Sequence, residues 1–379
     1  MTEETLLLAA RDGDPGFRYA SGFEVESGLY LRFGDGDDLL CVSALEHARA
    51  RAQGSASRVV DRAAAGWAEG QDESVNWARV ARRLLAERAR QRVRVPGDLP
   101  SALYVALLDQ GLAVDIDPAL FVAERRTKTP DETRRIQEAQ DAAQAALRAV
   151  VHRLRESRRD PDGVLWEGAA PLTSERLLAR CQEVLLEHGC ANLEAIIAGS
   201  PECAMPHYRG TGPIRAGAPV IIDIFPRQLA SGYHGDLTRT VVVGEVVPRV
   251  AAMHEACVAA MADAMAALRA GVDGRDVHLA ACRTLVAHGF GTLVPGFEGP
   301  EGAPRMIHST GHGVGLEVHE APALRDAPYP LLAGDVVSVE PGLYLEGLGG
   351  VRVEDLVLVE EGGYRNLTRL PASLDPAAY

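Results

Sequence analysis

The chain has 379 residues, of which 47% are hydrophobic and 24% charged, and its formal net charge is −14. A chain of this length is predicted to fold as a smaller and a larger domain, and the composition is that of a globular protein. The negative charge argues against a nucleic-acid surface, which requires clustered Lys and Arg. No stretch of 18 or more uncharged apolar residues occurs, so we expect no membrane-spanning segment.

The N-terminal sequence and the cysteines both bear on cellular location. The sequence MTEETLLLAARDGDP is acidic where a secretory signal peptide would be basic, which favours the cytoplasm. The cysteines form no CxxC pair and lie in helix-like or strand-like segments, so we expect them to be reduced core residues. The six are Cys41, Cys181, Cys190, Cys203, Cys257 and Cys282.

Residues 1–124 are predicted to form a compact α/β domain. Residues 28–43 are typical of two strands around a Gly-Asp-Gly turn, and a helix-like segment follows them. Helical patterns at 74–90 and 101–111 flank a short strand. The polar run at 124–129 then predicts a linker, which places a second domain at residues 125–379.

The second domain opens on a strong helix start at 129–132, where a capping hydroxyl, a first-turn Pro and two acidic residues follow one another. After Pro248 the order of predicted elements repeats, so the domain is expected to have two similar halves. The first half has helices from 130 to at least 154 and at about 174–188, with strands at 219–225 and about 236–244. The second has helices to about 270 and at about 275–288, with strands at 335–339 and 351–359.

Four acidic residues and one histidine stand out in this domain because each lies in an apolar or Gly-rich stretch. They are Asp223, Asp236, His312, Glu340 and Glu354. A buried carboxylate without a partner is costly, so such residues are expected to line a cleft or to bind a cation. Strands of both halves carry them, which would bring two carboxylates from each half into one central cleft. The pattern therefore predicts a two-metal hydrolytic centre.

Together with MPHYRGTG (205–212) and HSTGHGVGLEVHE (308–320), these motifs resemble the pita-bread metallopeptidases. That family contains aminopeptidase P, prolidase, methionine aminopeptidase and the non-metal creatinases. The resemblance covers residues 125–379, and the segments 17–23 and 39–51 are similar to the N-terminal domain of the aminopeptidase P and prolidase branch. It implies an α/β N-terminal creatinase-like domain followed by an α+β pita-bread catalytic domain with pseudo-twofold halves.

The resemblance also implies a division of labour among the ligands. Asp223 would chelate one metal, Asp236 and Glu354 would bridge both, and His312 with Glu340 would complete the second. Oxygen-rich ligation with one imidazole suits Mn²⁺, Co²⁺ or Zn²⁺, and we expect Mn²⁺. Four carboxylates match two divalent ions in charge.

Further residues take catalytic roles by the same resemblance. His207, His308 and His319 would contact the substrate and stabilise the tetrahedral intermediate formed when a metal-bridging hydroxide attacks the peptide carbonyl. Arg352 would hold the metal carboxylates and the substrate in register. Glu340 would also act as the proton shuttle to the departing nitrogen.

The expected activity is hydrolysis of Xaa-Pro bonds at the N-terminus of short peptides, by a prolidase or an aminopeptidase P. Proline has no N–H and a fixed ring, so a dedicated pocket is needed. In the resembled branch the N-terminal domain supplies part of it, often across a dimer interface, so a homodimer is expected. Phe225 stands where the family commonly has Gly. Ala323 stands where some prolidases carry an arginine for a dipeptide's carboxylate, with Arg325 nearby, which leaves both activities open.

Two other functions compete with this interpretation. A non-catalytic pita-bread module could use the cleft to bind a peptide or protein, but it would have no reason to retain four converging carboxylates. A creatinase-like amidinohydrolase should have an eroded ligand set, which this chain does not. Taken singly, His254, His278 and His288 are expected to be ordinary surface or core residues.

Overall fold

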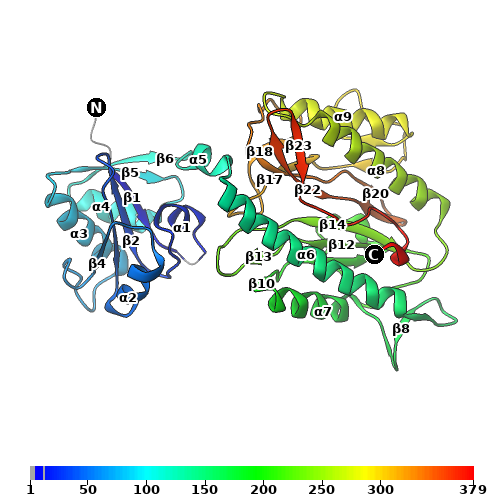
Figure 1. Ribbon diagram of the computed structural model, residues 1–379, viewed down its shortest axis with the longest axis horizontal. Coiled ribbons are helices and arrows are strands. Elements are labelled where there is room, and N and C mark those ends of the chain that lie inside the picture. The colour runs from blue at the N-terminus through cyan, green and yellow to red at the C-terminus, as the bar shows by residue number, and fades with distance from the viewer. Residues whose placement is uncertain (1–4, 12) are drawn as a thin grey trace. The chain divides into compact units, whose positions relative to one another are not determined.

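The computed structural model describes residues 5–11 and 13–379, and the chain divides into two compact units at Arg125 and Arg126 (Figure 1). This division lies one residue beyond the boundary expected from the polar run at 124–129. Each unit has apolar clusters of its own, so each buries a core independently.

The N-terminal unit is built on a six-stranded mixed sheet in the order β4-β3-β2-β1-β5-β6. The predicted hairpin is present as β2 and β3, with Gly36 in the left-handed region at φ 89°. Apolar clusters lie on both sides of the sheet. The strands are β1 (Thr5–Ala9), β2 (Leu29–Phe33), β3 (Asp38–Val42), β4 (Arg58–Asp61), β5 (Arg92–Pro96) and β6 (Ala113–Asp117), and the helices are α1 (Pro15–Ser21), α2 (Ala44–Gln53), α3 (Glu73–Ala86), α4 (Ser101–Asp109) and α5 (Val122–Arg126).

Two pairs of long helices organise the second unit. The predicted start of the first helix is correct, because Thr129 and Glu132 form a reciprocal capping box. The pairs are α6 (Pro130–Glu156) with α7 (Ser174–Glu187), and α8 (Pro248–Ala267) with α9 (Gly274–Ala287). Each pair covers its own apolar cluster, and Figure 1 shows the pairs on opposite sides of the strands. The predicted repeat of element order is therefore present.

Three sheets of the second unit carry the residues that matter for function. Their orders are β11-β12-β14, β18-β17-β19-β22-β23 and β15-β16-β20-β21. The strands are β11 (Ile196–Gly199), β12 (Pro219–Ile224), β14 (Leu237–Val242), β15 (Gly291–Thr292), β16 (Arg305–Met306), β17 (Gly311–Gly313), β18 (Glu320–Leu324), β19 (Val336–Val339), β20 (Gly342–Leu345), β21 (Gly349–Arg352), β22 (Asp355–Glu360) and β23 (Gly363–Asn366). Short strands complete the unit: β7 (Arg158–Arg159), β8 (Leu165–Glu167), β9 (Ala170–Pro171), β10 (Cys190–Ala191) and β13 (Arg227–Gln228).

The prediction of one continuous strand at 351–359 is wrong. The segment instead contains the end of β21 and most of β22, which belong to different sheets. Both sides of the break bond to β14: Arg352 N–H donates to Thr240 Oγ1 at 3.0 Å, and Glu354 N–H donates to the Thr238 carbonyl at 3.0 Å. The chain thus changes sheets while its backbone remains paired. Glu354 lies at this break.

Among the described residues, α8 alone is long and apolar enough to cross a membrane, by length and composition only. The same composition is typical of a core helix. Its buried residues, including Met253, Ala260 and Met265, join the cluster beneath α9 and the second-half sheets. The structure therefore uses this helix as a core element.

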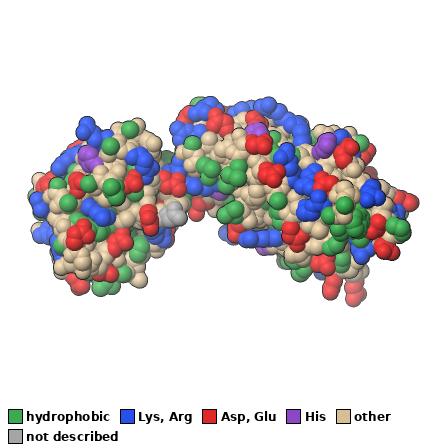
Figure 2. All heavy atoms as spheres, turned by 90° about the horizontal axis from the view of Figure 1, so that it is seen from below, with side chains coloured by type: hydrophobic (Ala, Val, Ile, Leu, Met, Phe, Trp, Pro, Cys, Tyr) green, Lys and Arg blue, Asp and Glu red, His purple; other side chains and the backbone are tan. Residues whose placement is uncertain are grey.

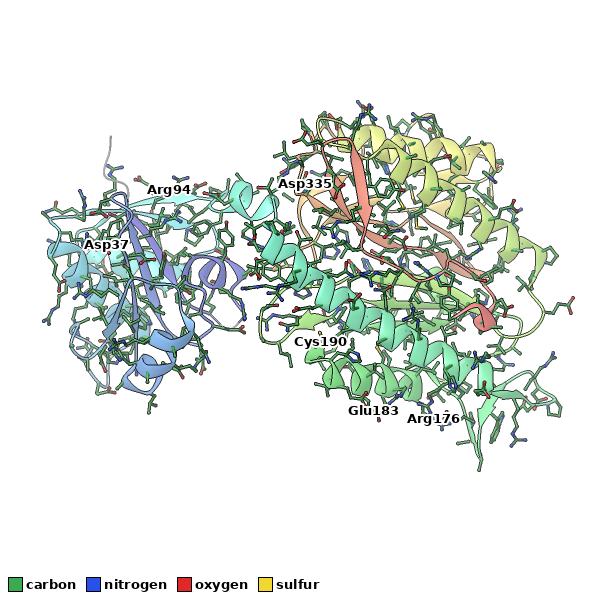
Figure 3. All side chains as sticks on the ribbon, viewed as in Figure 1. Asp37, Arg94, Arg176, Glu183, Cys190 and Asp335 are labelled. Carbon is green, nitrogen blue, oxygen red and sulfur yellow. The ribbon has the colours of Figure 1, made fainter. Side chains whose placement is uncertain are left out.

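All six cysteines are free and buried, Cys190 just after α7 among them (Figure 3). Burial raises the pKa of the Cys181 and Cys190 thiols, to about 12 and about 11, so they remain protonated at neutral pH. On the face shown in Figure 2, Lys and Arg side chains are intermingled with Asp and Glu. Charge on that face is therefore distributed between both signs.

Candidate metal centre

All five predicted metal ligands line one cavity of about 610 Å³ in the second unit. Asp223 lies in β12 and His312 in β17. Asp236 immediately precedes β14, Glu340 follows β19, and Glu354 precedes β22. Strands of both halves thus present these side chains to one space, as the sequence predicts.

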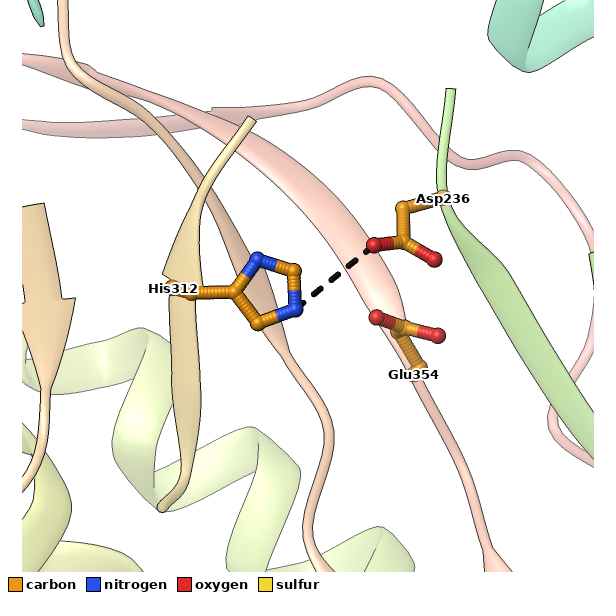
Figure 4. Close-up of side chains that lie close together, drawn as sticks. All are labelled: Asp236, His312 and Glu354. Atoms are coloured by element: carbon orange, nitrogen blue, oxygen red, sulfur yellow. Dashed lines mark ion pairs between the residues drawn. The ribbon is translucent and has the colours of Figure 1, made fainter. Parts of the chain in front are cut away.

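Three of these residues form the tightest cluster. Ligand atoms of Asp236, His312 and Glu354 all lie within 4.8 Å of one another (Figure 4). His312 Nε2 is 3.7 Å from an Asp236 oxygen and 3.3 Å from Glu340 Oε1. Asp223 lines the same cavity and accepts a hydrogen bond of 2.5 Å from Arg352 Nη2.

Burial and mutual repulsion shape the charge of two carboxyl groups. Asp236 and Glu354 are 3% and 2% exposed. Burial, reinforced by neighbouring carboxylates, raises the pKa of each well above its usual value. Without a cation, these two groups therefore resist ionisation.

His312 and Glu340 form an oppositely charged pair. Burial alone would lower the pKa of His312, but the hydrogen bond and charge of Glu340 outweigh it and raise the pKa to about 9. Burial alone would raise the pKa of Glu340, but the hydrogen bond from His312, with nearby positive charges, lowers it to about 2. Each member of this pair thus stabilises the charged form of the other.

The residues present fit a pair of divalent cations. The donor set is four carboxylates and one imidazole, the hard and borderline ligands that Mn²⁺, Co²⁺ and Zn²⁺ accept. Burial, reinforced by neighbouring carboxylates, disfavours the ionised forms of Asp236 and Glu354. Two divalent ions would supply balancing positive charge.

A chain of hydrogen bonds joins Arg352 to the carboxylate of Glu354. Arg352 Nε donates to Thr238 Oγ1 at 3.3 Å, and this hydroxyl donates to Glu354 Oε2 at 2.7 Å. Arg352 also binds Asp223, so one guanidinium orients two carboxylates on different strands. Thr238 thus connects the guanidinium of Arg352 to the carboxylate of Glu354.

The three predicted histidines line the same cavity, but their surroundings differ. His207 and His319 are exposed, and the ring of His319 lies 4.1 Å from that of His312. His308 is half-buried, and burial lowers its pKa, so it is a neutral imidazole at pH 7. Around the metal ligands, the side chains of His207 and His319 are therefore accessible to solvent, whereas that of His308 is half-buried.

Tyr344, on β20, is a buried residue behind the cavity lining that the sequence does not single out. Its hydroxyl accepts from Arg352 Nη1 at 2.8 Å and lies 2.9 Å from His308 Nε2. Because Arg352 only donates, the tyrosine proton is directed at His308 Nε2, and His308 Nδ1–H donates to the Ser309 carbonyl at 2.7 Å. Tyr344 thus fixes the tautomer of His308.

Arg239 is a second buried residue outside the sequence prediction, with no exposed surface. Its Nη2 binds Asp355 Oδ1 at 2.7 Å, and its Nη1 donates to the carbonyls of Thr238 and Glu354. One guanidinium thus links β14 to the start of β22 behind the ligands. Loss of one partner from such a buried pair costs about 3–5 kcal/mol.

The first residues of the second unit bind carboxylates elsewhere in the same unit. Lys128 Nζ binds Glu320 Oε1 at 2.6 Å, and both side chains are almost completely buried. Glu320 adjoins His319 in the sequence. Two residues earlier, Arg126 binds Asp335, labelled in Figure 3, through both carboxylate oxygens at 2.8 Å. The segment that follows the N-terminal unit therefore anchors the loop that carries His319.

Gln140 of α6 fixes the backbone of Asp236 from behind. Its Nε2 donates to the Asp236 carbonyl at 2.8 Å, and its Oε1 accepts from the Asp236 N–H at 2.7 Å. The backbone of α6 approaches so closely that a Cβ atom on Gly235 would lie 2.7 Å from the backbone nitrogen of Gln140. Polar residues on the largely apolar buried face of α6 are a sequence signal that such a contact exists, although the sequence does not identify the partner.

We expect Gln140→Ala to weaken metal binding by at least about tenfold, because residues that orient a ligand contribute about 10–100-fold to affinity. Mn²⁺ titration calorimetry of the chelator-treated protein measures this loss. Gln144→Ala is the matched control, since Gln144 is a buried amide one turn along α6 that accepts from Arg369 N–H instead. Equal losses in both variants would contradict a specific role for Gln140.

Residues 134–361 match the sequence profile of metallopeptidase family M24. The match covers more than half of the chain. The chain belongs to metallopeptidase family M24. The predicted resemblance to the aminopeptidase P and prolidase branch is confirmed by this family match and by the Xaa-Pro dipeptidase relatives. The pita-bread fold is confirmed too, because prolidase and X-Pro aminopeptidase structures superpose on 98% of this chain.

Relatives of this M24 metallopeptidase include the Xaa-Pro dipeptidase of Pyrococcus furiosus, 31% identical over 255 residues, which are 66% of this chain and 65% of that protein. The alignment thus spans slightly less than two thirds of the relative. The X-Pro aminopeptidase structure from Thermotoga maritima superposes with a TM-score of 0.82 at 23% identity, covering 98% of this chain and 97% of that one. An Xaa-Pro dipeptidase structure from Bacillus anthracis also gives 0.82 at 23% identity, covering 98% and 95%.

The departures from the family pattern all fall on the wall of this M24 cavity. Phe225, Ala323 and Arg325 line it together with the ligands. Phe225 N–H donates to Asn192 Oδ1 at 2.9 Å, which fixes the wall next to Asp223. The space that would select a substrate thus differs from the common pattern, whereas the ligand set does not.

Proposed function

We propose that this M24 metallopeptidase hydrolyses Xaa-Pro bonds at the N-terminus of short peptides. The observation that carries the proposal is the complete ligand set, which shares one cavity with His207, His308, His319 and Arg352. The Pyrococcus furiosus relative is named an Xaa-Pro dipeptidase. Both prolidase and aminopeptidase P activities agree with these features.

The ligands Asp223, Asp236, His312, Glu340 and Glu354 would hold two divalent ions, which would polarise the peptide carbonyl and lower the pKa of a water molecule between them. Glu340 lines the cavity beside His312, so its carboxylate is positioned to move a proton from the attacking water to the departing proline nitrogen. His207 and His319 are exposed to the cavity and can donate hydrogen bonds to the developing oxyanion.

Arg352 and Tyr344 orient these groups without taking part in bond making. The guanidinium holds Asp223 directly and Glu354 through Thr238. Tyr344 holds His308 as the neutral imidazole. The site is thus oriented before substrate binds, which reduces the reorganisation that the reaction requires.

We also propose Mn²⁺ as the working ion, with Co²⁺ or Zn²⁺ as alternatives, because the donor set is rich in carboxylate oxygen. A homodimer is proposed from the resemblance of the N-terminal unit to that of the prolidase branch. Six buried free cysteines support a reducing cytoplasmic location.

A non-catalytic binding module is the less favoured function. Such a module would have to tolerate Asp236 and Glu354 at the bottom of its cleft, where burial and repulsion raise their pKa values. Retaining that arrangement without a cation is costly. The intact ligand set also opposes a creatinase-like amidinohydrolase.

The proposal predicts that the Mn²⁺-loaded protein cleaves Ala-Pro or Ala-Pro-Ala but not Ala-Ala, and that chelation removes the activity. Quantifying the released alanine with the Mn²⁺, Co²⁺ and Zn²⁺ forms tests it. A preference for Ala-Pro selects prolidase, and cleavage of Ala-Pro-Ala selects aminopeptidase P. Full activity after rigorous chelation would refute the metal-dependent mechanism.

A further inference from the structure

A second cavity of about 430 Å³ adjoins the metal cavity. The two share His308, Ser309 and Arg325 as lining residues. Beyond them the wall of the second cavity is largely apolar, formed by Leu293, Val294, Pro295, Met306 and Ile307. Of the metal ligands and catalytic residues described above, only His308 lines this second cavity.

Two residues of the apolar wall are exposed, while Val294 and Met306 are buried beneath them. Leu293 is 64% and Ile307 is 43% exposed, although both are large hydrophobic residues. The turn after β15 is fixed, because Thr292 N–H donates to the Phe297 carbonyl at 2.8 Å and Phe297 N–H donates to the Val294 carbonyl at 3.0 Å. Exposed apolar surface on a preformed wall is typical of a ligand site.

The charges at the junction indicate which end of a peptide would enter. Arg325 lines both cavities, and its guanidinium has no ion-pair partner in the part of the chain that the structure describes. Asp326 lines the second cavity, but Arg275 neutralises it at 2.8 Å. The unpaired positive charge repels a free amino terminus and attracts the carboxylate end of a peptide.

We propose that the second cavity is a subsite for the apolar side chain of the residue that follows proline. This inference rests on the proposed function, in which the cleaved bond joins the first residue to proline. An N-terminal exopeptidase has no chain before the first residue, so a further residue must extend on the carboxyl side. The subsite would give the protein tripeptides or longer peptides with an apolar third residue as substrates.

The test compares kcat/KM for Ala-Pro-Leu and Ala-Pro-Ser in the Mn²⁺-loaded protein. We expect a preference of about tenfold for Ala-Pro-Leu, since burying part of a leucine side chain accounts for a factor of that size. Leu293→Asp should reduce this ratio to near one, and Leu293→Ala should reduce it partly. Leu186→Asp is the control: Leu186, on α7, is 60% exposed and lines neither cavity, so the ratio should remain unchanged.

The outcomes separate this inference from the proposed function. A protein that cleaves both tripeptides equally, or keeps its preference in Leu293→Asp, has no such subsite. If Leu293→Asp instead alters the ratio between Leu-Pro-Ser and Ala-Pro-Ser, the cavity takes the first residue and the proposal is wrong. A protein that cleaves neither these tripeptides nor Ala-Pro would overturn the proposed function itself, and the subsite with it.

Discussion

Asp236→Asn is expected to lower kcat/KM for Xaa-Pro hydrolysis by at least about a thousandfold, since it removes a carboxylate from the metal ligands. The same change should not destabilise the metal-free protein. Asp236 is 3% exposed, and burial with nearby carboxylates raises its pKa well above the usual value, so a neutral amide suits the empty cavity better. Activity assays and thermal denaturation of the chelator-treated protein measure the two effects.

Asp355→Asn is the control, and we expect it to lower the stability of the metal-free protein while leaving the metal site intact. Asp355 is also buried, but it binds Arg239 at 2.7 Å and does not line the metal cavity. Weakening the Asp355–Arg239 pair should lower the melting temperature of the metal-free protein, whereas all five metal ligands remain available to bind metal. A clear loss of metal-free stability in Asp236→Asn would show that its carboxylate is stabilising there, contrary to our reasoning.

The stabilisation by Mn²⁺ is expected to be larger at pH 8 than at pH 6. In the metal-free protein the pKa values of Asp236 and Glu354 are raised, and that of His312 is raised to about 9. At these three groups the folded state therefore binds more protons than the unfolded state, and their contribution to stability falls as pH rises from about 4 through about 9. Glu340, whose pKa is about 2, contributes stability that is constant in this range and is lost only as pH falls below about 4.5.

Metal binding reverses this dependence, because the ions displace the protons from carboxylates and imidazole. Each displaced proton raises the apparent metal affinity by about tenfold per pH unit. Thermal denaturation at pH 6 and pH 8, with Mn²⁺ and with chelator, measures the difference. Glu354→Gln, which removes one titrating ligand, should reduce it. Equal Mn²⁺-induced shifts at both pH values would mean that no proton is displaced.

The sequence predicts the order of elements and the convergence of the ligands well, because each ligand lies in its own strand-like motif. It does not predict the break at Glu354, since the apolar pattern is continuous across 351–359 and the division arises only because β21 pairs with β20 while β22 pairs with β19. Gln140 and Arg239 also escape prediction. Their partners are backbone groups about a hundred residues away, which no local pattern encodes.

Tyr344 and the second cavity are missed for a different reason. The role of Tyr344 depends on a hydroxyl meeting Arg352 and His308 at once, and β20 looks like an ordinary strand in the sequence. The apolar wall at Leu293 and Ile307 joins two segments that are unremarkable individually. Substrate selection thus depends on side chains that converge only in the folded chain.

The contacts of Arg126 and Lys128 determine where a catalytic fragment could begin. The second unit starts at Arg126 by its internal packing, and Arg126 and Lys128 bind Asp335 and Glu320 within it. A fragment begun at the helix start at Thr129 would lose the Arg126–Asp335 pair and the buried Lys128–Glu320 pair, the second of them next to His319 in the sequence. Domain swaps and truncations in this protein should therefore keep residues 126–128 with the C-terminal part, even though they resemble a dispensable linker in the sequence.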